Sequence, residues 1–309
     1  MALPKKVIIR ESAPRDGWQN WKTQIPTEKK LEYIKKMIDL GTRTMEVTSY
    51  VSPKWVPQLA DADTVTTEVL EYCKGKECLP TALTLNGRGV ERAIGLGMKN
   101  VCFVISASNE HNKRNSNKST LECLADFEKM CEAYQDRGLN VMLAVACSFG
   151  SPFGETIQAD EVKRICEVAL RHGIREVGLA DSAGVSTPDN TQRMLDEILP
   201  YVGAENVSMH LHDTRGMGLA NVYVGLLNGI TTFDAALGGM GGCPYIPGAK
   251  GNIATEDVVN MCQAMGIDTG YDLEKLTALS VEMTTDLGAP IVSSMASLYV
   301  KQHTDICKD

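Results

Sequence analysis

The sequence of 309 residues lacks the long apolar runs that membrane spans and secretion signals require. No window approaches the roughly 18 consecutive apolar residues that are typical of a transmembrane helix. The first residues, MALPKKVIIRES, lead directly into a strand-like run. They contain neither the apolar core of a signal peptide nor an Arg- and Ser-rich transit segment. We therefore expect a soluble, cytoplasmic protein.

Basic residues and cysteine pairs with metal-site spacing are also scarce. Lysine and arginine total 31 against 39 acidic residues, so the formal net charge is −8 at pH 7. This acidic balance argues against nucleic acid as the main partner, although local basic groups can still bind an anionic substrate. The ten cysteines lack the paired spacing of a zinc site and mostly lie inside apolar runs, so we expect reduced thiols.

No linker or low-complexity segment interrupts an alternation of strand and helix patterns. Helical runs separate eight β-rich runs, and many of these helical runs end in a glycine shortly before the next strand. The β-rich runs cover residues 6–11, 42–50, 79–85, 100–108, 140–148, 176–183, 206–213 and 231–239. The pattern predicts an α/β fold, a (β/α)8 TIM barrel over about residues 5–265, with a doubly wound open sheet as the alternative. Residues 266–309 are expected to add C-terminal helices, so that 1–309 form one catalytic domain.

Polar residues lie where these predicted strands end, which is the end that carries the chemistry in such barrels. His210 and His212 end the seventh strand, and residues i and i+2 of a strand point to the same face. Such a pair can bind a divalent metal; alternatively, one imidazole is packed in the strand and the other is solvated. The other polar residues at strand ends are Arg15, Asp16, Glu46, Asp181, Cys243 and Asn252.

Four segments of the chain resemble the 3-hydroxy-3-methylglutaryl-CoA lyases. They read PRDGWQNWK, MEVTSYVSPKWVPQLAD, HLHDTRGMGLAN and GGMGGCPYIPGAKGN, and the similarity runs from about residue 7 to 275. This metal-dependent TIM-barrel superfamily also contains isopropylmalate and homocitrate synthases. The glycine-rich loop with its single cysteine separates the lyases from the synthases.

The resemblance implies a metal-dependent retro-Claisen cleavage of a 3-hydroxyacyl-CoA to acetyl-CoA and acetoacetate, or the matching 3-oxoacid. It implies that one divalent cation, Mg²⁺ or Mn²⁺, is ligated by Asp16, His210, His212 and Asn252. Mixed oxygen and nitrogen ligation suits those ions better than a closed, thiolate-rich zinc site. It further implies an acyl-CoA substrate and a homodimer.

Catalytic roles follow from the same resemblance. Arg15 stabilises the thioester oxygen as it becomes an enolate, because a guanidinium is always charged and offers several donors. Glu46 orients the site beside Arg15, or is simply its buried ion-pair partner. Asp181 and His210 handle the hydroxyl proton, Cys243 delivers or relays a proton to the leaving enolate, and Lys22 meets the CoA phosphates.

Other functions remain open. The same bond chemistry serves a different acid, such as citramalyl-CoA or a longer-branched analogue, or a synthase running the condensation. A non-catalytic barrel that binds acyl-CoA or a partner protein is the alternative outside enzymes.

Several positions depart from the usual pattern of these lyases, and we expect them to reshape the acyl pocket. Trp18, Arg215 and Gly178 stand where an aliphatic residue, a tyrosine and a serine are common. We expect Trp55 to be a packing anchor, and the polar run 108–119 to be a solvated loop after the fourth strand.

Overall fold

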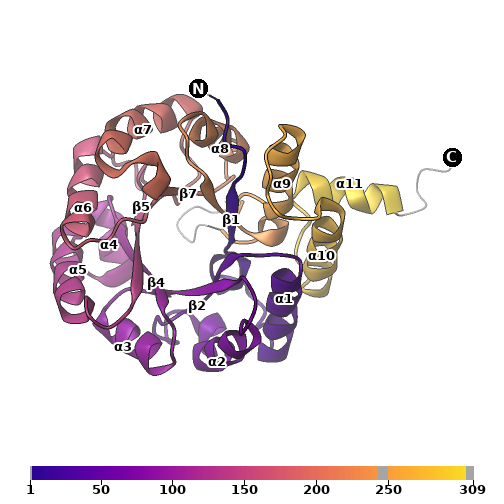
Figure 1. The fold of residues 1–309 in the computed structure, drawn as a ribbon, viewed down its shortest axis with the longest axis horizontal. Coiled ribbons are helices and arrows are strands. Elements are labelled where there is room, and N and C mark those ends of the chain that lie inside the picture. The colour runs from indigo at the N-terminus through magenta and orange to yellow at the C-terminus, as the bar shows by residue number, and fades with distance from the viewer. Residues whose placement is uncertain (1, 243–249, 304–309) are drawn as a thin grey trace.

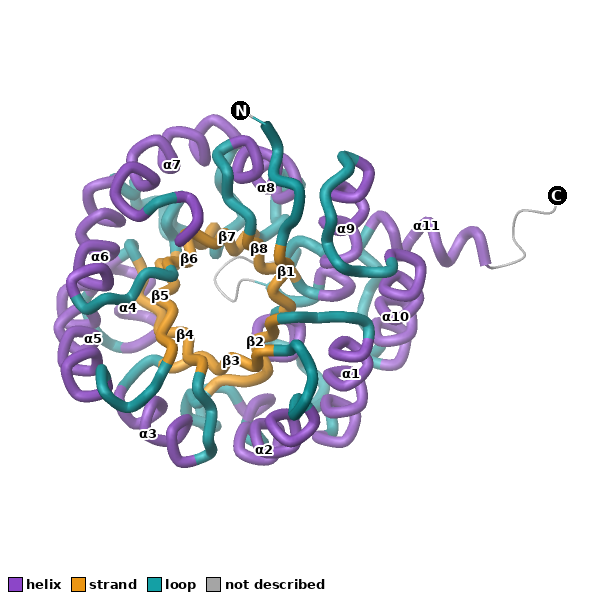
Figure 2. The backbone as a smooth tube through the Cα atoms, viewed as in Figure 1, coloured by secondary structure: helices purple, strands orange, loops and turns teal. Residues whose placement is uncertain are grey.

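The computed structural model describes residues 2–242 and 250–303, which form a closed barrel of eight parallel strands (Figure 1). The strands follow one another around the barrel in chain order, and β8 pairs with β1 (Figure 2). Their bounds are β1 Ile8–Glu11, β2 Thr44–Ser49, β3 Leu79–Thr84, β4 Asn100–Ser106, β5 Asn140–Ala146, β6 Val177–Asp181, β7 Val207–Leu211 and β8 Thr232–Ala235. Each lies within one of the eight predicted runs, so the barrel prediction is confirmed and the open sheet is wrong.

Helices surround the barrel on the outside (Figures 1 and 2). They are α1 Thr27–Asp39, α2 Ala62–Tyr72, α3 Gly87–Gly95, α4 Asn109–Ser116, α5 Thr120–Tyr134, α6 Ala159–Arg171, α7 Pro188–Val202, α8 Gly218–Leu227, α9 Thr255–Ala264, α10 Leu273–Asp286 and α11 Ser294–His303. Helix α6 shows why they pack there: Val162, Ile165, Cys166 and Ala169 are buried and recur at helical spacing, which gives one apolar face. No helix among the described residues is long and apolar enough to cross a membrane.

The register across β7, β8 and β1 aligns three polar residues at one level of the barrel. Asp234 of β8 pairs with His210 of β7 on one side and with Arg10 of β1 on the other. Neighbouring residues in register point to the same face of a parallel sheet. These three side chains therefore form one layer inside the barrel.

The predicted C-terminal helices are present. Helix α10 packs against α9, α11 and α1, outside the barrel next to β1 (Figure 1). Helix α11 extends furthest from the barrel axis, and Ala296 is its one buried residue among those described.

Two local expectations are wrong. The run 108–119 is not a solvated loop: it contains α4, which Ser108 caps by accepting a hydrogen bond from the His111 N–H. A serine cap and the buried face of His111 and Asn112 outweigh the polar composition. Trp55 is not a packing anchor, because it is 76% exposed and lines the cavity described below.

Candidate functional site

The turn after β1 presents two of the predicted residues. Residues Ala13–Gly17, with the sequence APRDG, form a single π-helical turn, η1, in which the N–H groups of Arg15, Asp16 and Gly17 all approach the Ser12 carbonyl. Such wide turns are frequent at functional sites. The turn leaves the Arg15 and Asp16 side chains at the carboxyl end of the barrel.

Arg15 is held between two carboxylates. Its Nε donates to Glu46 Oε2 at 2.8 Å, Nη2 bonds the same oxygen, and Nη1 bonds Asp16 Oδ1. Burial alone would lower the pKa of the guanidinium, but Glu46 and Asp16 together raise it above its ordinary value. Arg15 is therefore a fixed cation, with only 11% of its side chain exposed.

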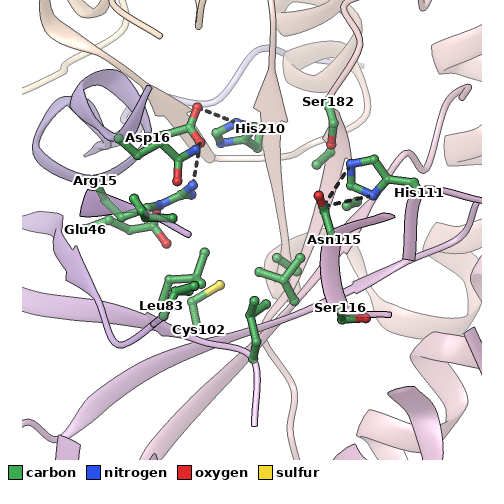
Figure 3. A pocket seen from close by; sticks show the side chains of 18 of the residues that line it. Arg15, Asp16, Glu46, Leu83, Cys102, His111, Asn115, Ser116, Ser182 and His210 are labelled. Atoms are coloured by element: carbon green, nitrogen blue, oxygen red, sulfur yellow. Dashed lines mark hydrogen bonds and ion pairs between the residues drawn. The ribbon is translucent and has the colours of Figure 1, made fainter. Parts of the chain in front are cut away.

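A cavity of about 830 Å³ opens beside this cation. Figure 3 shows Arg15, Asp16, Glu46 and His210 on one side of it, with His111, Asn115 and Ser182 across from them. The wall supplied by β3 to β6 is mostly apolar and is lined by Leu83, Leu85, Cys102, Val104, Met142, Ala144, Ala146, Gly178 and Ala180. The volume lies within the usual range for small-molecule and cofactor sites.

Three predicted metal ligands converge at the polar wall. Single ligand atoms of Asp16, His210 and His212 lie within 4.8 Å of one another. Asp16 Oδ2 is 3.5 Å from His212 Nε2 and 3.9 Å from His210 Nε2, and the two Nε2 atoms are 3.2 Å apart. Two ring nitrogens at that distance cannot both carry unshared lone pairs without a proton or cation between them, so the arrangement fits a cation site.

Charge at this cluster favours ligation. Burial alone would raise the pKa of Asp16, but Arg15 and the two histidines hold it well below its usual range. The carboxylate is consequently ionised at neutral pH. One carboxylate and two imidazoles are a donor set that suits a divalent cation.

Asn252, the fourth predicted ligand, lies next to Asp16 and His212 because two backbone segments approach each other closely. It pairs with His212 in an isolated antiparallel bridge, and its Nδ2 donates to Asp16 Oδ2 at 2.8 Å. Its Oδ1 is buried and has no hydrogen-bond partner in the described part of the chain. A Cβ at Gly251 would lie 2.7 Å from backbone atoms of Gly239 and Gly241, so only glycine allows this packing. The orphaned Oδ1 beside the cluster supports a fourth ligand for a cation.

Other predicted residues lie apart from this cluster. Asp181 does not line the cavity; its carboxylate accepts from the N–H groups of Val185 and Ser186 at 3.1 and 2.9 Å, and burial raises its pKa. Lys22 is exposed and is not among the cavity-lining residues. Cys243 lies outside the described residues.

The sequence interpretation missed two residues that contact this cluster. Gln19 donates to Asp16 Oδ1 at 2.8 Å, and Asp234 Oδ2 lies 3.2 Å from His210 Nδ1. Asp234 was detectable, because it is the one acid in the apolar run 231–239. Nothing in the sequence pointed to Gln19 except its position in the segment PRDGWQNWK.

Only one of the three departures from the lyase pattern reaches the cavity. Gly178 lines it, whereas Trp18 is fully buried in the hydrophobic core and Arg215 is exposed. Among the described residues that depart from the pattern, Gly178 is therefore the one positioned to alter the acyl pocket.

Comparisons with known proteins identify the family of the chain. The HMGL-like family model matches residues 6–282. A hydroxymethylglutaryl-CoA lyase of Bacillus subtilis is 39% identical over 297 residues, covering 95% of this chain and 97% of that protein. The crystal structure of a B. subtilis HMG-CoA lyase superposes with a TM-score of 0.92 at 38% identity, over 97% of this chain and 100% of that one.

A second solved structure is an HMG-CoA lyase from Acinetobacter baumannii in complex with coenzyme A and 3-methylmalate. It superposes with a TM-score of 0.89 at 36% identity, over 99% of this chain and 98% of that one. The resemblance inferred from the four sequence segments is confirmed by these matches along nearly the whole chain. The chain belongs to the HMGL-like family.

Proposed function

We propose that the protein is a metal-dependent carbon–carbon lyase that cleaves 3-hydroxy-3-methylglutaryl-CoA, or a close analogue, into acetyl-CoA and acetoacetate or the matching 3-oxoacid. The observation that carries this proposal is Arg15, held by Glu46, beside the Asp16–histidine cluster at one wall of a substrate-sized cavity. Cleavage to an enolate needs a fixed positive donor next to the group that activates the hydroxyl. The relatives' names, and the coenzyme A bound in the A. baumannii structure, support an acyl-CoA substrate.

In the proposed reaction the substrate's tertiary hydroxyl loses its proton, C3 becomes a carbonyl as the C2–C3 bond breaks, and the electron pair passes into the thioester enolate. Asp16, His210, His212 and Asn252 would hold Mg²⁺ or Mn²⁺, which lowers the pKa of that hydroxyl when bound. Arg15 stabilises the enolate oxygen, and Glu46 keeps the guanidinium in place. The enolate finally takes a proton at C2, which yields acetyl-CoA.

Proton transfer is assigned to three residues. His210 and Asp181 are the proposed acceptors of the hydroxyl proton, and burial raises the pKa of Asp181, which makes its carboxylate a stronger base. Cys243, outside the described residues, is the proposed donor to the enolate. Lys22 remains a proposed contact of the CoA phosphates, and Lys113 and Arg114 line the cavity with charge of the same sign.

The remaining assignments extend this proposal. We propose that residues 1–309 form one catalytic domain that acts in the cytoplasm as a homodimer. Light scattering at micromolar concentration tests the dimer, and a monomer would contradict it. A non-catalytic barrel is disfavoured, because such a protein has no need to keep Arg15, Asp16 and both histidines together.

The test of function is acetyl-CoA release from a small thioester panel with Mg²⁺, with Mn²⁺, and with chelator. The panel holds 3-hydroxy-3-methylglutaryl-CoA, citramalyl-CoA and a longer-branched analogue. We expect metal-dependent release, with the acyl preference read from the ratio of kcat/KM values. Absence of turnover on every 3-hydroxydicarboxylic acyl-CoA would overturn the lyase proposal.

A further inference from the structure

From His210, two more buried charged side chains, Asp234 and Arg10, follow in turn around the inside of the barrel. Asp234 Oδ2 lies 3.2 Å from His210 Nδ1, and Asp234 Oδ1 accepts from Arg10 Nη1 at 3.1 Å. All three residues occupy the same level of the barrel on adjacent strands β7, β8 and β1. Both ion pairs are buried, because the exposed fraction of the side chain is 12% for His210 and 6% each for Asp234 and Arg10.

Arg10 is itself anchored, so it acts as a fixed donor. Its Nη2 bonds Glu176, and its Nη1 also approaches Met142 Sδ at 2.9 Å and Ser208 Oγ at 3.5 Å. With one carboxylate oxygen held by Arg10, the Asp234 carboxylate cannot rotate away from His210. The second oxygen is therefore committed to the imidazole.

From this geometry we infer that Asp234 is a positioning residue, which fixes His210 as the tautomer with hydrogen on Nδ1 and thereby aims the Nε2 lone pair at the metal cluster. A carboxylate oxygen only accepts, so the ring nitrogen facing it must donate. Such carboxylate–histidine–metal arrangements orient a ligand and raise its basicity. Asp234 is not one of the acidic and histidine ligands that come together, which in the described part of the chain are Asp16, His210 and His212.

The two histidines differ in this respect. His212 Nδ1 is buried and has no hydrogen-bond partner among the described residues, whereas His210 Nδ1 faces Asp234. The orientation of His210 is thus set from within the barrel, and that of His212 by its contacts with Asp16 and the bridge to Asn252. When His210 binds a cation through Nε2 in this tautomer, it has no lone pair left. Of the two proposed acceptors of the hydroxyl proton, the inference therefore favours Asp181 over His210.

The substitution Asp234→Asn keeps the size of the side chain but replaces one of the two accepting carboxylate oxygens with an NH₂ donor. The oxygen of the new amide must face Arg10, because an NH₂ group in that place would put two hydrogen-bond donors, the amide and the guanidinium, against each other. Its NH₂ then faces His210 Nδ1, which makes that nitrogen an acceptor and places the ring hydrogen on Nε2. We expect Mn²⁺ affinity to fall by roughly 10- to 100-fold, the usual loss when an outer partner of a metal ligand is removed.

The inference rests on the proposed metal site, so the experiment has one readout that needs neither metal nor activity. Nitrogen-15 NMR of the imidazoles in metal-free protein reports the tautomer directly, and the chain has only five histidines. We expect the His210 signals to change from hydrogen on Nδ1 in the wild type to hydrogen on Nε2 in Asp234→Asn. Titration calorimetry with Mn²⁺ on the same samples gives the change in affinity.

A matched control is Asp61→Asn, which also breaks an ion pair with a buried cation, Lys30, at 2.9 Å, but lies outside the cavity. We expect it to leave both the His210 tautomer and Mn²⁺ affinity unchanged. An unaltered tautomer in Asp234→Asn, or an affinity within twofold of the wild type, would overturn the inference. A wild-type protein that shows the Nδ1–H tautomer but binds no Mn²⁺ would instead contradict the metal site and leave the tautomer result standing.

Discussion

The two walls of the cavity are built from opposite kinds of residue. The wall from β7, β8, β1 and β2 carries Arg15, Asp16, Glu46 and both histidines, each held by a neighbouring charge or hydrogen bond. The wall from β3 to β6 carries small or aliphatic side chains, with Gly178 and Ala180 on β6. The first wall is thus suited to the reacting bond and the second to the shape of the acyl group. Substitutions on the polar wall should change turnover and metal binding, and those on the apolar wall should change substrate choice.

The largest effect is expected for Arg15→Met, which removes the positive charge while keeping side-chain length. Arg15 meets negative charge that develops on the thioester oxygen only as the bond breaks, so kcat should fall far more than substrate binding. By analogy with a single oxyanion donor, the loss is about 100- to 1,000-fold. Steady-state kinetics on the best thioester of the panel measures it. Near-normal turnover would reduce the strand-1 turn to a structural role.

The reverse pattern is expected for His212→Ala on the same wall. Removing a ligand nitrogen that lies 3.2 Å from His210 Nε2 should weaken Mn²⁺ binding at least about tenfold, with activity partly restored by excess Mn²⁺. Arg15→Met should retain its Mn²⁺ affinity, because Arg15 is not a ligand. If calorimetry finds that Arg15→Met loses the metal while His212→Ala keeps it, the two roles have been assigned the wrong way round.

Behind the polar wall, a buried acid makes stability depend on pH. Glu11 accepts from the N–H groups of Ala13 and Leu237 at 2.8 and 2.9 Å, and so ties η1 to the start of η4, Leu237–Gly239. Burial raises the pKa of Glu11 from 4.5 to about 7, despite these hydrogen bonds. The folded state therefore binds the proton more tightly than the unfolded chain, so this contribution is present below about pH 4.5 and is lost as pH rises to about 7.

The corresponding variant is Glu11→Gln, which should flatten the pH dependence over that window by up to about 3 kcal/mol. Urea denaturation of metal-free protein at several pH values measures the slope. Glu256, whose pKa burial also raises, should leave a residual slope of the same sign. An identical slope in the variant and the wild type would show that folding does not change the pKa of Glu11.

The smallest effect is expected on the apolar wall, for Gly178→Ser. A Cβ at this position meets Ser208 Oγ at 3.3 Å and only ordinary contacts otherwise, so the barrel should tolerate it. The added hydroxyl can make one hydrogen bond to a polar acyl group, which is worth about 1 kcal/mol. We therefore expect KM for such a substrate to fall roughly fivefold, with little change in kcat. Gly178→Ala is the matched control, since it adds the carbon without the donor. If both variants shift KM equally across the thioester panel, the wall does not recognise acyl polarity.

Much of the fold and of the polar wall could be read directly from periodicity. The eight strands followed from apolar runs separated by helical stretches, and His210 and His212 share a face because strand residues alternate. Arg15, Asp16 and Glu46 were placed together because strand ends converge at one rim of a barrel. These are consequences of local backbone geometry, which a single sequence expresses within a few residues.

What depends on contacts between distant segments could not be read in this way. The pairing of Asp234 with His210 and Arg10 comes from the register of three strands, and residues 10 and 234 meet only when the barrel closes. The exposure of Trp55 likewise depends on what packs against it in the folded chain, not on its own sequence neighbours. Alternation along a strand determines which side chains share a face. Which of those side chains meet depends on the register of the hydrogen bonds between strands, and that register is set only when the sheet closes into a barrel.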